Sequence, residues 1–296
     1  MAKHSLLLCF EDELAIARQV ADAAGIELAV IERHHFPDGE LKLRLPERLR
    51  GPVALLRSLD RPNEKLVELL LSAQTARQLG AAHLTLIAPY LAYMRQDMAF
   101  RPGEAVSQTI VGRFLASLFD AVITVDPHLH RVATLEQAVP VPQAVVLSGA
   151  PLLSDLIARH HASPLLMGPD GESAQWVAQA ARRHGFDHAV CHKVRNGDRQ
   201  VSIALPDVAL QDRAVVLIDD VASTGRTVAQ AARLALQAGA ASVDVAVTHA
   251  LFAGDALEVI GQSGVRHVWS TDSIAHASNA VAIAPLLAPA LLALQT

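Results

Sequence analysis

The sequence predicts an α/β protein made of two related halves, each a mainly parallel β-sheet flanked by helices. Short apolar runs alternate along the 296 residues with longer segments of helical period, which is the pattern of parallel sheets covered on both faces. A strand–helix–strand pattern that begins at Val53 recurs at Val215, an offset of about 160 residues, the size of one domain. The alternative interpretation is chance, because any two such units look alike in an alanine-rich chain.

The elements follow in order from this alternation. The apolar runs predict strands at 5–9, 28–30, 53–57, 84–88, 121–125, 164–167, 188–191, 201–204, 214–218, 242–247 and 267–270. The segments of helical period predict helices at 64–79, 108–118, 172–184 and 227–238. A last apolar stretch, 284–294, contains two prolines and is shorter than the ~20 residues that span a bilayer, so we expect a helix packed on the body of the protein.

The proline-rich stretch at 140–142 predicts a domain boundary close behind it. We expect an N-terminal domain at 1–147 and a C-terminal domain at 148–282, with about 283–296 packing back on the first. Parallel sheets bind ligands beyond the carboxyl ends of their strands, so the loops after strands are where the chemistry is expected.

Composition excludes several classes of protein. With 51% hydrophobic and 19% charged residues, the chain is neither disordered nor collagen-like. A net charge of -5 and only 4% aromatic residues argue against a nucleic-acid partner. Two cysteines cannot build a disulfide framework or a cysteine-rich zinc site, and the apolar run at 5–10 is too short for a signal peptide. We therefore expect a cytoplasmic protein with no membrane partner.

The strongest local signal is the segment after the predicted strand at 214–218. Asp219 and Asp220 follow the strand, then a turn with hydroxyl groups and Gly225, and then a helix. Such a turn aims backbone N–H groups at an anion, and the helix adds its N-terminal partial positive charge. The two acids suit sugar hydroxyls, a magnesium ion or a developing cation. The alternative is an ordinary helix after a strand, with Ser223 or Thr224 as its N-cap.

These residues resemble the ribose-phosphate loop of the phosphoribosyltransferase superfamily. The resemblance implies that Asp219 and Asp220 face the ribose hydroxyls. It also implies that the 5-phosphate is held by Ser223, Thr224, Gly225, Arg226 and Thr227. Arg226 departs from the small residue that is usual there. A base-specific phosphoribosyltransferase is one function compatible with this loop, although it leaves the first half of the chain unexplained.

Other polar motifs also follow predicted strands or turns. Arg95-Gln96-Asp97 lies past the strand at 84–88, and His128 follows the strand at 121–125. Asn196-Gly197 predicts a hairpin turn, so Lys193 and Arg195 share one face of a basic flap. Each has a simpler interpretation as a solvated loop or hairpin. The remaining motifs are the turn with Phe36, Asp38 and Glu40, and Asp170 in Gly-Pro-Asp.

In this order, the motifs resemble the ribose-phosphate diphosphokinase family over nearly the whole chain. The resemblance implies two phosphoribosyltransferase-type domains, an ATP-side N-terminal one and a ribose-5-phosphate-binding C-terminal one. It implies transfer of the diphosphoryl group of Mg-ATP to the 1-hydroxyl of ribose 5-phosphate, with Mg²⁺ as cofactor, in a homodimer or higher homo-oligomer. A non-catalytic, nucleotide-binding regulatory homologue is the other alternative.

The resemblance also implies a role for each residue. The catalytic residues are Lys193, Arg195 and Asp220. ATP is bound by Phe36, Asp38, Glu40, Arg95, Gln96, Asp97 and His128, and the metal by His128 and Asp170.

Overall fold

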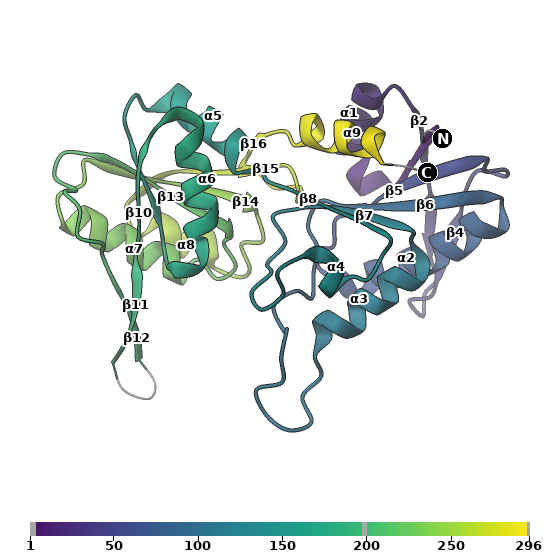
Figure 1. The fold of residues 1–296 in the computed structure, drawn as a ribbon, viewed down its shortest axis with the longest axis horizontal. Coiled ribbons are helices and arrows are strands. Elements are labelled where there is room, and N and C mark those ends of the chain that lie inside the picture. The colour runs from purple at the N-terminus through teal and green to yellow at the C-terminus, as the bar shows by residue number, and fades with distance from the viewer. Residues whose placement is uncertain (1–3, 197–199, 295–296) are drawn as a thin grey trace. The chain divides into compact units, whose positions relative to one another are not determined.

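The computed structural model describes residues 4–196 and 200–294, with the backbone alone at 193–196 and 200–202. The chain divides into two compact units, which Figure 1 shows in the colours of the chain. The N-terminal unit contains Met1–Leu147 together with Ala284–Thr296, and the C-terminal unit contains Ser148–Ile283.

The N-terminal unit is built on a sheet of six parallel strands in the order β2-β1-β5-β6-β7-β8. The strands are β1 (Leu6–Cys9), β2 (Glu27–Val30), β5 (Gly51–Leu56), β6 (Ala81–Ala88), β7 (Ala121–Val125) and β8 (Gln143–Leu147). Helices α1 (Leu14–Ala24) and α9 (Ala284–Ala293) pack together on one side of the sheet. On the other side lie α2 (Pro62–Gln78), α3 (Ser107–Leu118) and α4 (Leu135–Ala138) (Figure 1).

The C-terminal unit repeats this strand order as β10-β9-β13-β14-β15-β16, again all parallel. Its strands are β9 (Leu165–Gly168), β10 (Asp187–Val190), β13 (Ala214–Val221), β14 (Ser242–His249), β15 (Val265–Thr271) and β16 (Asn279–Val281). One apolar core contains side chains of α5 (Ala150–His160) and α6 (Ala174–His184). A second contains those of α7 (Arg226–Gln237) and α8 (Ala256–Gly261).

Each unit carries an antiparallel hairpin after the outer strand of its sheet. In the N-terminal unit, β3 (Glu32–His35) pairs with β4 (Leu41–Arg44). In the C-terminal unit, β11 (His192–Asn196) pairs with β12 (Gln200–Ala204). The hairpin predicted from Asn196-Gly197 is therefore confirmed, although residues 197–199 lie outside the described part of the chain.

The α/β class and the two related parallel sheets are confirmed. The strand predicted at 214–218 continues to Val221, so Asp219 and Asp220 lie within its last three residues rather than in a loop. A short 3-10 helix, Gly171–Ser173, precedes the helix predicted at 172–184. In the described part of the chain, no helix combines the length and apolar character needed to cross a membrane.

Candidate active site

In the C-terminal unit, three carboxylates gather where two neighbouring strands end. β9 and β13 run parallel, with Met167 opposite Leu217. Asp170 lies two residues beyond the end of β9, and Asp219 and Asp220 lie at the end of β13. The strand order changes direction between these two strands, and this is the position at which open α/β sheets bind ligands.

The three acids repel one another. Burial, the adjacent Asp220 carboxylate and the nearby Asp170 raise the pKa of Asp219 well above its usual range. Asp220 is itself only 3% exposed, and Asp170 only 7%. Such a group of buried carboxylates is stabilised by a cation, and carboxylate oxygens are the ligands that Mg²⁺ takes in proteins. The donor set therefore fits a magnesium ion.

Backbone contacts hold Asp170 at the end of β9. Its Oδ1 accepts a hydrogen bond from the Glu172 N–H at 3.0 Å, and its carbonyl oxygen accepts one from the Ser173 hydroxyl at 2.6 Å. Gly168 is required just before it, because a Cβ there would collide with the Ser173 hydroxyl. The position of Asp170 is thus fixed by its hydrogen bonds to residues 172 and 173 and by the lack of a side chain at Gly168.

The loop after β13 leads directly into α7. Gly225 adopts a φ of 69°, and a Cβ there would lie 2.9 Å from the Ala256 carbonyl oxygen, so glycine is required for two reasons. The Ala222 and Ser223 carbonyl oxygens accept hydrogen bonds at 2.9 and 2.8 Å from the backbone of residues 252 and 253. The first-turn N–H groups of α7 have no acceptor within the helix, which makes this loop a suitable place for an anion.

Arg226 begins α7, and its side chain is 69% exposed. Its guanidinium lies 3.7 Å from the carboxylate of Asp255, which precedes α8. Arg226 therefore extends outward in this structure, while Thr224 is also exposed and Ser223 and Thr227 are half-buried.

The predicted nucleotide residues belong to the N-terminal unit. The tip of the β3–β4 hairpin is closed by the Phe36 N–H, which donates to the Glu40 carbonyl oxygen at 2.8 Å. Asp38 Oδ1 accepts the Glu40 N–H at 3.2 Å. All three side chains are exposed.

Arg95, Gln96 and Asp97 lie on the long loop between β6 and α3. Arg95 is exposed, and Gln96 donates its amide to the Met98 carbonyl oxygen at 2.9 Å. The Asp97 carboxylate is buried beside Arg131, 2.5 Å from its guanidinium. Asp97 therefore holds the loop to the segment after β7, a contact that sequence spacing did not indicate.

His128 lies on that segment, half-buried, with its ring edge-on to the ring of His130 at 4.7 Å. Lys193 and Arg195 lie two apart on β11, opposite Ile203 and Val201 of β12, which puts them at equivalent register positions of the flap. Their side chains lie outside the described part of the chain. The structure thus brings together Asp170, the acid pair and the loop at 223–227, while the roles of the other predicted residues stay predictions.

Comparison with known proteins gives two family matches and several close relatives. Residues 6–118 match the N-terminal domain of ribose phosphate pyrophosphokinase, and residues 149–263 match the phosphoribosyl transferase domain. The ribose-phosphate pyrophosphokinase of Methanopyrus kandleri is 34% identical over 96% of this chain and 98% of that protein. Ribose-phosphate pyrophosphokinase 2 of Archaeoglobus fulgidus is 33% identical over 92% and 95%.

Among solved structures, the following example matches over nearly the whole chain. The phosphoribosylpyrophosphate synthetase from Mycobacterium smegmatis superimposes with a TM-score of 0.85 at 25% identity, and the match covers 98% of both chains.

Proposed function

Since the chain belongs to the ribose-phosphate pyrophosphokinase family, we propose that it transfers the diphosphoryl group of Mg-ATP to the 1-hydroxyl of ribose 5-phosphate, giving phosphoribosyl pyrophosphate and AMP. The observation that carries this proposal is the group of carboxylates at the carboxyl ends of β9 and β13. There Asp170, Asp219 and Asp220 lie beside a glycine-containing loop at a helix N-terminus. Carboxylates accept hydrogen bonds from sugar hydroxyls, and the loop suits the 5-phosphate.

The reaction needs an oxygen nucleophile in line with the leaving group. In our proposal, Asp219 and Asp220 orient the ribose hydroxyls, and the loop at 223–227 anchors the sugar by its phosphate. The 1-hydroxyl oxygen forms a bond to the β-phosphorus of ATP. The bond between the β-phosphorus and the oxygen that bridges it to the α-phosphate breaks, and AMP leaves with that oxygen. Asp220 accepts the proton of the hydroxyl. Lys193 and Arg195 stabilise the charge that spreads over the transferring phosphoryl oxygens.

Mg²⁺ is the proposed cofactor, held by Asp170 on the sugar side and by His128 on the nucleotide side. When bound, it neutralises phosphoryl charge. ATP is assigned to Phe36, Asp38 and Glu40 at the hairpin tip, and to the segment Arg95-Gln96-Asp97 with its exposed guanidinium. Support comes from the exposed side chains of the hairpin tip and of Arg95, and from the family to which the chain belongs.

AMP release in the presence of ATP, Mg²⁺ and ribose 5-phosphate tests the proposal, with phosphoribosyl pyrophosphate identified by phosphorus NMR. We expect AMP formation to depend on the sugar. ATP hydrolysis at a rate that does not depend on ribose 5-phosphate would refute the proposed transfer. Consumption of phosphoribosyl pyrophosphate with a purine or pyrimidine base would instead identify a base-specific phosphoribosyltransferase, and nucleotide binding without turnover a regulatory homologue.

We further propose a homodimer or higher homo-oligomer that works in the cytoplasm. A groove of about 620 Å³ lies between the hairpin and α2. Polar side chains, including Glu40, line part of it, and the apolar side chains of Leu41, Val67 and Leu71 line the rest and support contact with a second copy. The two cysteines are unpaired and buried, and burial raises the pKa of Cys191 to about 11. Unpaired thiols favour a reducing compartment. Light scattering during gel filtration tests the oligomeric state.

A further inference from the structure

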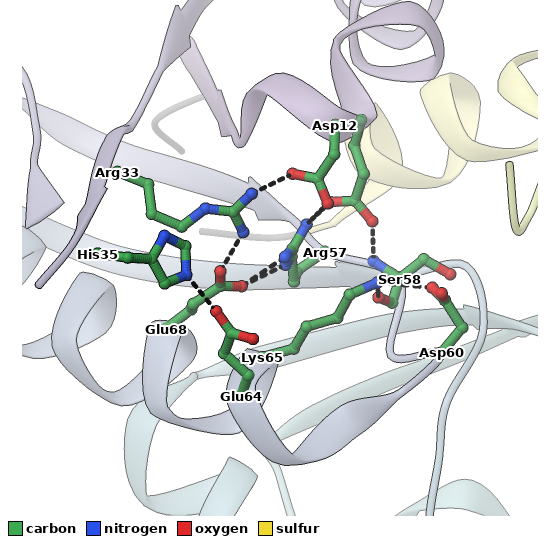
Figure 2. Close-up of polar contacts among 10 residues, drawn as sticks. Asp12, Arg33, His35, Arg57, Ser58, Asp60, Glu64, Lys65 and Glu68 are labelled. Carbon is green, nitrogen blue, oxygen red and sulfur yellow. Dashed lines mark hydrogen bonds and ion pairs between the residues drawn. The ribbon is translucent and has the colours of Figure 1, made fainter. Parts of the chain in front are cut away.

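A network of buried charges occupies the N-terminal unit at the carboxyl ends of β1 and β5. Because the two sheets share one strand order, this is the position that corresponds to the carboxylate group at the ends of β9 and β13. Figure 2 shows the Arg57 guanidinium at the centre of the network, between Glu68 of α2 and the segment after β1. The two units thus carry different charges at equivalent positions.

Arg57 is 1% exposed and has its partners within the unit. Its Nε and Nη2 lie 2.7 and 2.5 Å from Glu68 Oε2, and Glu68 is fully buried. Its Nη1 donates to Asp12 Oδ2 at 2.7 Å, and its guanidinium lies 4.6 Å from the centre of the Phe10 ring. Glu68 and Asp12 are therefore paired with the protein's own arginine, whereas the acids of the other unit suit a bound cation.

The network extends from Arg57 to the β3–β4 hairpin. Arg33 of β3 donates to Glu68 and lies 3.4 Å from Asp12, and its guanidinium is 5.5 Å from the same Phe10 ring. His35, two residues further along β3, lies 2.5 Å from Glu64 Oε1. Figure 2 shows both side chains directed from the hairpin toward α2.

The spacing of these residues explains why the contacts act together. Residues two apart on a strand point to the same face, and residues four apart on a helix lie on one ridge. Arg33 and His35 thus match Glu68 and Glu64, and two contacts hold β3 to α2. The hairpin tip begins at Phe36, immediately after the second contact.

We propose that Arg57, Glu68 and Arg33 are positioning residues that hold the hairpin tip in its ATP-binding arrangement. Arg57 holds the Glu68 carboxylate in place through Nε and Nη2, and Glu68 in turn holds Arg33. None of the three contacts the reacting atoms. The inference rests on the proposed role of Phe36, Asp38 and Glu40 in binding ATP.

The same hairpin offers a matched control. Arg44 of β4 and Glu32 of β3 form an ion pair at 3.5 Å, but both side chains are 69% exposed and the pair joins only the two strands of the hairpin. Exposed pairs of this kind contribute little. Arg44→Met therefore removes a hairpin arginine without removing the attachment to α2.

Steady-state kinetics of Arg33→Met, Arg33→Lys and Arg44→Met test the proposal. Arg33→Met leaves the Arg57–Glu68 pair intact, so the variant is expected to fold. We expect its KM for ATP to rise about tenfold, the effect of losing one charge-assisted hydrogen bond. Its kcat and its KM for ribose 5-phosphate should stay within about twofold of wild type, as should all constants of Arg44→Met. Arg33→Lys should restore most of the affinity.

Hydrogen–deuterium exchange of the hairpin peptide, without substrates, gives a second measurement. Exchange at residues 34–40 should be faster in Arg33→Met and unchanged in Arg44→Met. Unchanged exchange and an unchanged KM for ATP in Arg33→Met would overturn the inference, as would equal rises in the KM of both substrates. Asp38→Asn distinguishes an error in the proposed role of the network from an error in the proposed role of the hairpin. If Asp38→Asn raises the KM for ATP and Arg33→Met does not, only the role of the network is refuted. If neither variant affects ATP, the hairpin's proposed role in nucleotide binding is wrong, and the inference is refuted with it.

Discussion

Replacement of Glu13 by glutamine should change how the stability of the N-terminal unit depends on pH. Glu13 is 8% exposed and accepts the Ser58 N–H through Oε1 at 2.6 Å. Burial raises its pKa to about 7, against the opposing attraction of Arg57 and Lys65. The folded protein therefore keeps a proton on Glu13 at pH values at which the unfolded chain, with a pKa of 4.5, has released it.

The sign and size of the effect follow from this difference. A carboxyl whose pKa is raised by folding favours the folded state below its unfolded pKa, and this advantage is lost as the pH rises toward 7. One pKa unit corresponds to about 1.36 kcal/mol, so the full effect is about 3 kcal/mol, of which about 2.5 kcal/mol falls between pH 5 and pH 8. Glu13→Gln cannot titrate and should lack this part of the slope.

Guanidinium unfolding at pH 5, 6, 7 and 8 measures the effect as the difference between wild type and variant. Tyr90 and Tyr93 lie in the N-terminal unit, whereas Trp176 and Trp269 lie in the C-terminal unit, so tyrosine near-UV circular dichroism follows the first and tryptophan fluorescence the second. The exposed neighbour Glu11, replaced by glutamine, controls for the substitution itself. Wild-type and Glu13→Gln stabilities that run parallel over this range would refute the reasoning.

Three further outcomes are expected. Asp220→Ala should lower kcat by about 10²- to 10⁴-fold, the range for a lost general base, with ATP affinity by calorimetry nearly unchanged; an unchanged kcat would remove it from the mechanism. Lys193→Ala or Arg195→Ala should each lower kcat at least ~10²-fold in the AMP assay, and activity near wild type would contradict their role. Gly112→Ala should lower the stability of the N-terminal unit by about 2 kcal/mol, because the added Cβ would collide with the carbonyl oxygen of Ala138 in α4. Calorimetry should show this as a fall of about 4–8 °C in Tm. Gly261→Ala is the control, since a Cβ at that position meets open space.

The sequence predicted those parts of the fold that repeat or alternate. Apolar runs located the central strands, and the acids after the strand predicted at 214–218 located the carboxylate group at the ends of β9 and β13. The hairpin strand Glu32–His35 has no apolar alternation, and its contacts with α2 join residues about 30 positions apart. Periodicity and local motifs carry no information about such pairs. The buried partners of Arg57 were missed for the same reason, because an arginine after a strand looks the same in sequence whether it is solvated or paired.

Helix α9 follows the whole C-terminal unit in the chain, yet it packs against α1 of the N-terminal unit. During translation, the ribosome therefore completes residues 148–283 before it produces the helix that covers α1. The C-terminal unit, whose sequence lies between the two parts of the N-terminal unit, therefore has all of its strands while the N-terminal unit still lacks α9. Vectorial synthesis thus gives the C-terminal unit an earlier opportunity to finish folding, and leaves the apolar surface of α1 exposed to chaperones until α9 emerges.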